Sequence, residues 1–219
     1  MLKHASDTIR VMPLFPFDMP KEVLWISVVW DRQMLGIVYQ TEFPKEEDNM
    51  FLKSTLRLDT LQDLFVSELK DIYDAETQVM EAMPKLIDAA TSDDLQNKFR
   101  QHRDQTRTQM DSLEDIFEMM DMEPQREHCD GMAGILKDLD KVIRAEGDTN
   151  VKDAALIAEV QKVEHYEIAS YGTLRTFAQT MGHSDYADKL QMTLEQAAAT
   201  DKILSDFAMR SVNVRSPQM

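Results

Sequence analysis

The sequence predicts an all-α protein: a bundle of four long helices over residues 56–213, preceded by an N-terminal appendage over residues 1–50. Apolar side chains recur at three- and four-residue spacing in four long segments after residue 59, as on one face of a helix. Two connections between these segments are short, and the third is long enough to cross the bundle. Residues 1–49 instead hold both tryptophans and most of the prolines.

Composition restricts the class of partner. The chain has 219 residues, of which 43% are hydrophobic, so its length and content suit a domain with a sizeable core. Acidic residues number 40 against 24 basic ones, which gives a formal net charge of −16. This balance opposes binding to phosphate backbones, because nucleic-acid-binding proteins rely on basic patches. We therefore expect no nucleic acid among the partners.

Cysteine content and hydropathy indicate the compartment. Cys129 is the only cysteine, so no internal disulfide or multi-cysteine zinc site can form, which fits a reducing compartment. Its polar segment, REHCDG, predicts an incidental loop residue and not a reactive thiol. The longest apolar run near the start, Val23 to Trp30, is much shorter than the ~20 residues of a membrane helix, and no targeting signal surrounds it. We predict a cytoplasmic protein with no membrane partner.

The appendage is predicted to be a loose hairpin. Two β-rich runs, Val23 to Trp30 and Met34 to Gln40, are separated by a short polar turn at residues 31–33. An isolated hairpin is only marginally stable in water, so this segment must dock, oligomerise or stay poorly ordered. An alternative is that the biological start is Met50 and that the preceding residues are an artefact of start-site choice, since no feature after Met50 depends on them.

The first two helices of the bundle are predicted from their caps and apolar faces. The first begins at Asp59 or Thr60, residue types that cap helix N-termini, and its apolar face continues to Met83. The second begins at Ser92 and its face continues to Met120, with a polar stretch at the middle. Because the loop between them is short, the two helices should be antiparallel neighbours.

The later helices follow a connection of about thirty residues that contains a short helix of its own, before a break at residues 147–150. A short loop at Gly182 joins the last two long helices, so they too should be antiparallel. Two antiparallel pairs joined by one long crossover form the ferritin-like arrangement. The predicted segments are Met132 to Arg144 for the short helix, Lys152 to Met181 for the third long helix and Tyr186 to Val212 for the fourth.

Polar side chains interrupt the apolar faces near the middle of the bundle. Glu164 and Glu167 fall on one face of the third long helix, at positions that are otherwise apolar. Glu76, His102 and Asp201 take similar positions on the first, second and last helices. An ionised carboxylate is costly to bury without a partner, so such residues are normally paired, protonated or bound to metal. This pattern predicts an internal cation site.

A plainer interpretation of the paired acids is also open. The inward face of their helix could be wide enough for Glu164 to lie at its edge, where solvent reaches it. Lys162 or Arg175 would then pair with the acids as an ordinary ion pair on the helix surface. The single helix does not decide between a surface ion pair and a buried cation site.

Four sequence blocks are distinctive: ELKDIYDAETQ around Glu76, QHRDQT around His102, DAALIAEVQKVEHYEIASYGTL around Glu164 and Glu167, and ATDKIL from Ala199. Through these blocks, from about Thr60 to Asn213, the chain resembles the YciE/YciF family of ferritin-like proteins. This family is grouped with ferroxidases and rubrerythrin-like proteins and is associated with bacterial stress responses.

The resemblance implies a di-iron carboxylate site inside the bundle. Matched position by position, it implies that Glu76 is the acid of the first helix, His102 the histidine of the second, and Glu164 and Glu167 the paired acids after the crossover. Carboxylate oxygen and imidazole nitrogen suit iron, with manganese as the other candidate. We take these four residues, with Asp201, as the predicted metal ligands.

Two departures from the family pattern fall in this set. Family members usually carry an acid where this chain has Gln105, and an acidic pair where it has Gln196 and Ala197. A glutamine carbonyl is a weak ligand that cannot bridge as an anion, and alanine offers none. Three matched carboxylates then face up to four positive charges on a ferrous pair. Asp201, one helical turn beyond Ala197, or Glu195 is the candidate to compensate.

The function implied is that of a ferroxidase or of a stress protein that handles peroxide or oxygen, in which bound ferrous iron is oxidised to ferric iron. An alternative from another class is a metal-degenerate bundle with a structural or interaction role in the stress response. In that alternative, His102, Gln105 and Glu164 form a buried hydrogen-bonded network without metal. A homodimer that buries an outer helical face is the expected assembly.

Overall fold

The computed structural model of the chain describes residues 9–11, 26–28, 37–39 and 57–217. The chain divides into two compact units after residue 56. The predicted boundary at residue 50, the turn at residues 31–33 and the alternative start at Met50 lie outside the described residues.

The first unit contains a three-stranded antiparallel sheet in the order β1, β2, β3. Strands β2 and β3 lie within the two runs predicted as strands, and they pair with Ile26 opposite Tyr39. The third strand, β1, falls in a segment for which the sequence analysis predicted none. The strands span Ile9–Val11 for β1, Ile26–Val28 for β2 and Ile37–Tyr39 for β3.

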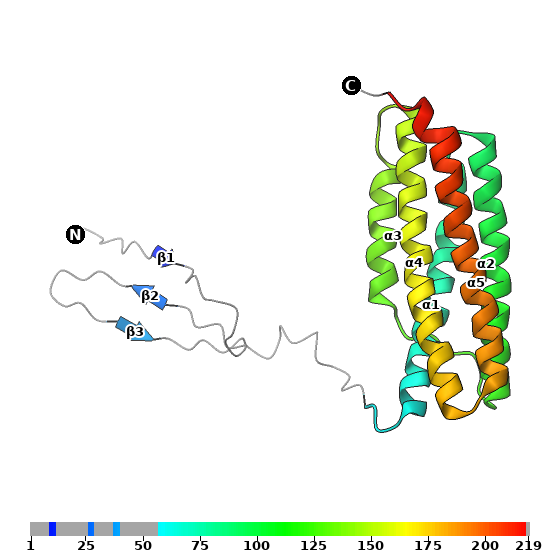
Figure 1. Cartoon of the computed structure of the whole chain (residues 1–219). Coiled ribbons are helices and arrows are strands. Elements are labelled where there is room, and N and C mark those ends of the chain that lie inside the picture. The colour runs from blue at the N-terminus through cyan, green and yellow to red at the C-terminus, as the bar shows by residue number, and fades with distance from the viewer. Residues whose placement is uncertain (1–8, 12–25, 29–36, 40–56, 218–219) are drawn as a thin grey trace. The chain divides into compact units, whose positions relative to one another are not determined.

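The second unit is the predicted all-α bundle, with one long crossover that contains a short helix (Figure 1). Helix α1 packs along α2, α4 packs along α5, and the short helix α3 packs against α1 and α4. Its helices are α1 (Leu61–Ala89), α2 (Asp93–Met119), α3 (Asp130–Ile143), α4 (Thr149–Met181) and α5 (Ser184–Phe207), followed by a π-helical turn η2 (Ala208–Val212) and a 3-10 turn η3 (Asn213–Arg215).

The helix ends follow from local capping chemistry. Thr60 is the cap of α1, and its hydroxyl accepts from the Asp63 amide at 3.1 Å while the Asp63 carboxylate accepts from the Thr60 amide at 2.9 Å. Asp148 caps α4, so this helix begins at Thr149, within the predicted break at residues 147–150. At its other end Gly182 has φ 84°, the left-handed conformation that glycine adopts most readily.

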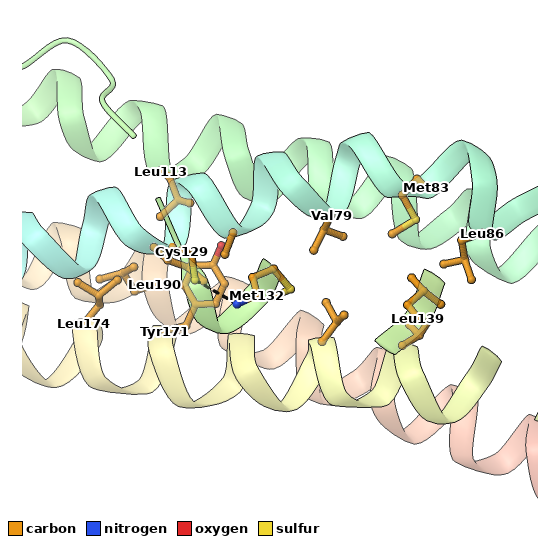
Figure 2. Close-up of a cluster of buried hydrophobic side chains, with 14 of the residues drawn as sticks. Val79, Met83, Leu86, Leu113, Cys129, Met132, Leu139, Tyr171, Leu174 and Leu190 are labelled. Atoms are coloured by element: carbon orange, nitrogen blue, oxygen red, sulfur yellow. Dashed lines mark hydrogen bonds between the residues drawn. The ribbon is translucent and has the colours of Figure 1, made fainter. Parts of the chain in front are cut away.

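One continuous apolar core joins all five helices (Figure 2). It includes Val79 and Met83 from α1, Met132 and Leu139 from α3, and Leu174 from α4, each no more than 2% exposed. Each large apolar side chain of this kind contributes roughly 1.5–3 kcal/mol when it is fully buried. The core therefore fixes α3 over α1 and α4 and leaves the centre of the four long helices for the polar residues described below.

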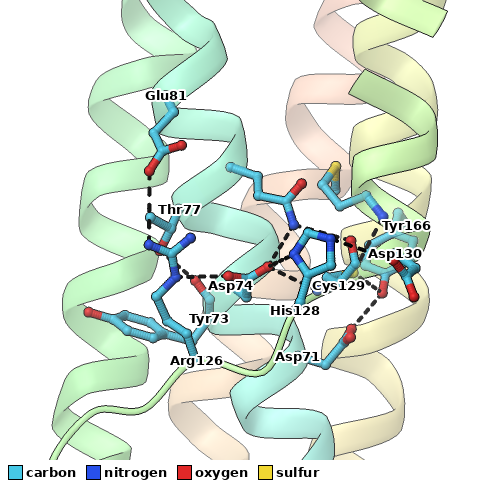
Figure 3. Close-up of polar contacts among 12 residues, drawn as sticks. Asp71, Tyr73, Asp74, Thr77, Glu81, Arg126, His128, Cys129, Asp130 and Tyr166 are labelled. Atoms are coloured by element: carbon cyan, nitrogen blue, oxygen red, sulfur yellow. Dashed lines mark hydrogen bonds and ion pairs between the residues drawn. The ribbon is translucent and has the colours of Figure 1, made fainter. Parts of the chain in front are cut away.

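A polar cluster fixes the start of the crossover helix to the bundle (Figure 3). The buried carboxylate of Asp74 on α1 accepts from Arg126 at 2.8 Å and from the Cys129 amide at 2.9 Å. Burial raises the pKa of Asp74, but hydrogen bonds from Cys129, Gln78 and Arg126 outweigh it, and the net pKa is below its usual value. On α4, the Tyr166 hydroxyl donates to Asp71 at 2.6 Å and lies 2.9 Å from the Cys129 sulfur.

Cys129 is therefore not the incidental loop residue that the sequence predicted. It is 1% exposed, and its sulfur accepts from the Met132 amide at 3.3 Å, which caps the N-terminus of α3. Burial raises the pKa of this thiol, which keeps it a poor nucleophile at neutral pH. The polar segment REHCDG did not predict this burial, because the side chains that contact Cys129 from α1 and α4, Asp74 and Tyr166, are far away in the sequence.

Within the described residues, no helix is both long enough and apolar enough to cross a lipid bilayer.

Asp153 near the start of α4 is predicted to be a main stabilising contact between the two helix pairs. Its buried carboxylate accepts from the Thr91 amide at 2.8 Å, the Thr91 hydroxyl at 2.9 Å and the Ser92 amide at 3.2 Å. Asp153→Ala leaves these donors without partners and should lower the free energy of unfolding by about 2–4 kcal/mol. Urea denaturation measures this, with the exposed Asp88→Ala as the matched control. A loss no larger than that of the control would contradict the assigned role.

Candidate metal centre

Four of the predicted ligands are buried inside the bundle. Glu76, Glu164 and Glu167 are 0% exposed and His102 is 3% exposed. The Nδ1 atom of His102 lies 3.3 Å from a Glu164 carboxylate oxygen, which joins α2 to α4. The charge of Glu76 acts on both Glu164 and Glu167, which joins α1 to α4. The helical periodicity that placed these residues inward therefore brings them to one region of the core.

The polar atoms of these side chains are almost all without partners. Among the described residues, the only hydrogen bond recorded for the four side chains is the one that Glu76 Oε1 accepts from Tyr171. Buried polar atoms in native proteins normally have partners, and a cluster of exceptions requires an explanation such as a bound ion or water. The atoms without partners are Glu76 Oε2, His102 Nδ1 and Nε2, both carboxylate oxygens of Glu164 and both of Glu167.

Tyr171 holds one of the carboxylates in place. Its hydroxyl donates to Glu76 Oε1 at 2.6 Å, and the tyrosine is 0% exposed. Burial, reinforced by the charges of Glu76 and Glu167, raises the pKa of Tyr171 well above its usual value, so the hydroxyl keeps its proton and remains a donor. The tyrosine therefore restrains Glu76 and leaves its second oxygen available.

Burial dominates the electrostatics of the cluster. It raises the pKa of Glu76 to about 8 and, with the charges of Glu76 and Asp201, that of Glu164 to about 9. The pKa of Glu167 is raised well above its usual value by burial and by the two neighbouring acids. Burial lowers the pKa of His102 to about 4. Without a metal, the buried site therefore favours protonated carboxyl groups and a neutral imidazole at neutral pH. A divalent cation would instead favour the ionised carboxylates.

The surface ion pair that was open at the sequence level does not form. Lys162 donates to Glu159 at 2.7 Å, and Arg175 donates to Gln191 on α5. Glu164 lies in the core and not at the edge of the helix face. The two basic residues that could have paired with the acids therefore have other partners.

Asp201 is not brought into this cluster. Its side chain is 23% exposed, and it accepts from Gln161 at 2.9 Å and lies 3.5 Å from His165. The inward face of α5 passes through Ala197 and Thr200, so Asp201 is rotated away toward α4 and solvent. Its charge still raises the pKa of Glu164, which places it at the rim of the site.

The two departures from the family pattern both face the core. Ala197 is 0% exposed, and the Gln105 carbonyl accepts from the Thr200 hydroxyl at 3.0 Å. The hydrogen-bonded network of His102, Gln105 and Glu164 that was predicted for a metal-free bundle is not formed. Gln105 instead accepts from Thr200 on α5, and the His102–Glu164 contact lacks hydrogen-bond geometry. One turn further along α2, Gln109 is also 0% exposed and neither of its amide atoms has a partner among the described residues. Gln109 belongs to the polar stretch that the sequence predicted at the middle of this helix face, and it was not among the predicted ligands.

The donor set suits a metal in its chemistry. Carboxylate oxygens and one imidazole nitrogen are ligands for iron, manganese or zinc, and their free lone pairs agree with such a role. In the part of the chain that the structure describes, no three His, Cys, Asp or Glu side chains already surround one point as a closed metal-binding group. Binding would therefore require the glutamate side chains to turn toward a common centre.

Four long helices joined by a long crossover, with buried acids and a histidine in the core, define a ferritin-like helical protein. The chain belongs to the YciE/YciF family: the family described as "Domain of unknown function (DUF892)" matches residues 60–216. Over 162 residues the chain is 38% identical to Protein YciF of Escherichia coli strain K12, which covers 74% of this chain and 98% of that protein. The resemblance found in the sequence is thereby confirmed.

Solved structures agree with this assignment. The crystal structure of the E. coli stress protein YciF matches with a TM-score of 0.68 at 39% identity, over 71% of this chain and 99% of that one. YcfI from Rhodopseudomonas palustris matches with a TM-score of 0.66 at 35% identity, over 71% and 98% of the two chains. Dps from Thermosynechococcus elongatus, at 16% identity and a TM-score of 0.54 over 71% and 97% of the two chains, shares the fold.

The buried acids predict an unusual pH dependence of stability for the metal-free protein. Because the pKa values of Glu76 and Glu164 are raised in the folded state, unfolding releases protons above pH 4.5, and stability should fall until the pH passes about 8–9. His102, with its pKa lowered to about 4, opposes this trend only below about pH 6.5. Between pH 7 and 8, each carboxyl should therefore remove on the order of 1 kcal/mol of stability.

Urea denaturation of chelator-treated protein across this range measures the effect. Glu164→Gln keeps the shape of the side chain and removes its titration, so the slope should become shallower. An unchanged slope in this variant, or stability that does not fall between pH 7 and 9 in the unmodified protein, would show that the carboxyl groups are ionised without penalty.

Proposed function

We propose that this protein binds ferrous iron in the bundle and oxidises it with dioxygen or peroxide, as a ferroxidase-type stress protein. The observation that carries the proposal is the group of buried carboxylate and imidazole atoms without partners, contributed by Glu76, His102, Glu164 and Glu167. Burying acids in this way destabilises a protein unless a partner compensates, and a divalent cation is the partner that matches the donor chemistry.

Each residue would have a distinct task. His102 would give a neutral imidazole nitrogen, because burial has already lowered its pKa to about 4. Glu164 and Glu167 would bind from one face of α4, and Glu76 would bind from α1 through the oxygen that Tyr171 leaves free. Bound iron would supply the electron that the oxidant takes. The surrounding apolar core would keep bulk water away from the reacting atoms.

The proposal also includes a physiological role, a location and an assembly. The E. coli relative is described as a stress protein, and we extend that role to this chain. A cytoplasmic location and a homodimer complete the proposal, because a single cysteine fits a reducing compartment and bundles of this length often pair through an outer face. Light scattering of the purified protein measures the assembly.

A second candidate function is a metal-free bundle that acts as a structural or interaction protein in the stress response. Two observations favour it. Among the described residues no closed metal-binding group is present, and Gln105 and Ala197 occupy positions where the family usually has acids. In this case the acids would stay protonated and would use water or one another as hydrogen-bond partners.

Metal analysis distinguishes the two functions. Protein purified without chelator should contain iron or manganese, and stripped protein should take up ferrous iron anaerobically and turn it ferric on addition of peroxide. Glu164→Gln should weaken ferrous binding at least about tenfold, because it removes a charged ligand without changing the shape of the side chain. Glu159→Gln is the matched control, since Glu159 is a buried acid of the same helix that pairs with Lys162.

The result that would contradict iron binding is a stripped protein that takes up no ferrous ion. Equal affinities of the Glu164→Gln and Glu159→Gln variants would also contradict it, because the uptake would then occur outside the cluster. Binding without peroxide-dependent oxidation would instead leave a metal-binding protein that is not a ferroxidase.

A further inference from the structure

The last helix gives no acid to the interior. In ferritin-like di-iron proteins two helices each give one glutamate, and the other two each give a glutamate and a histidine three residues apart. In this chain the buried positions of α5 near the site are Thr193, Ala197 and Thr200, and the nearest acid, Asp201, is turned to the rim. The ligands must therefore come from α1, α2 and α4 alone.

Helix α2 gives a histidine and two neutral amides. His102, Gln105 and Gln109 follow one another along its inward face, at spacings of three and four residues. The Gln105 carbonyl is already occupied by the Thr200 hydroxyl at 3.0 Å, and the amide nitrogens of Gln105 and Gln109 have no partner among the described residues. Amide groups of this kind hydrogen-bond water or another small neutral molecule, and they do not neutralise a cation.

The available charge and donor atoms match one divalent ion better than two. Glu76, Glu164 and Glu167 supply at most three negative charges, against two positive charges on one ion and four on a pair. Their oxygens and one His102 nitrogen give up to seven donor atoms, one of which also accepts from Tyr171. A divalent first-row ion takes about four to six donors, so one ion can be satisfied and a pair would rely heavily on water.

We infer that each chain binds a single divalent metal ion, held by Glu76, His102, Glu164 and Glu167, and that the neutral side chains of Gln105, Gln109 and Ala197 stand where a second ion would need charged ligands. This inference rests on the proposed function, because it concerns the number of ions in the same cluster. A single ion also limits the redox chemistry.

Oxidation of two ferrous ions by one peroxide and two protons gives two ferric ions and two waters. One bound ferrous ion gives only one electron, so each peroxide must react with two ions that bind one after the other, or with the ions of two chains.

Counting bound ions tests the inference on the full-length protein. Anaerobic titration calorimetry and equilibrium dialysis, with Mn²⁺ and separately with Fe²⁺, should give one ion for each chain. Electron paramagnetic resonance of the Mn²⁺ form should show the resolved hyperfine pattern of an isolated ion and not the spectrum of an exchange-coupled pair. This spectrum needs no variant, so it stands even if a substitution impairs folding.

A double variant tests why each chain binds one metal ion and not two. Gln105→Glu with Ala197→Glu adds a carboxylate from α2 at a half-buried position and one from α5 at a buried position, and it should raise the number of bound ions from one to two. The matched control is Gln101→Glu with Ala199→Glu, which adds the same charges to exposed positions of the same two helices and should leave the number at one. Circular dichroism establishes that both variants are folded.

The outcomes separate this inference from the proposed function. Two ions in the unmodified protein, or an exchange-coupled Mn²⁺ spectrum, would overturn the inference and leave the proposed function intact. A folded double variant that still binds one ion would overturn the role given to Gln105 and Ala197. No ion in the unmodified protein would overturn the proposed function, and the inference with it.

Discussion

The burial of three carboxyl groups on facing helices is the constraint on which the rest of this structure depends. Glu76, Glu164 and Glu167 are wholly removed from solvent, and among the described side chains no lysine or arginine is paired with them. Three ionised acids cannot share such a space, so they must be protonated or must share a cation. The raised pKa values of these acids and the proposed metal binding are two consequences of the same burial.

Hydrogen bonds between the helices keep the acids together. A helix that rotates by one residue turns its side chains by about 100°, which would carry a glutamate out of the cluster. Asp153 ties the start of α4 to the loop between α1 and α2, and Tyr166 ties its middle to Asp71 on α1. Asp74 joins the start of α3 to α1 in the same way. Because these contacts fix the helix positions, the acids cannot relieve their repulsion by moving apart.

The sequence predicted the parts of the molecule that depend on short-range periodicity. The four long helices, the short crossover helix and the inward direction of Glu76, His102, Glu164 and Glu167 all follow from spacings of three and four residues. Whether the Asp201 side chain points into the core was harder to predict. Asp201 lies one turn beyond Ala197, and its direction depends on the way α5 packs on α4. The contact between Tyr171 and Glu76 and the contacts of Cys129 with Asp74 and Tyr166 were not predictable, because the partners are remote in the chain.

Metal binding by the buried acids is tested most directly by anomalous X-ray diffraction from crystals of the full chain. The crystals would be grown anaerobically with ferrous iron, and data would be collected at the iron absorption edge. Binding of one ion in the core predicts one strong anomalous peak, in contact with His102 and the three buried glutamates. A peak only at the acidic surface groove that includes Asp111, Glu114 and Asp115, or no peak at all, would contradict it.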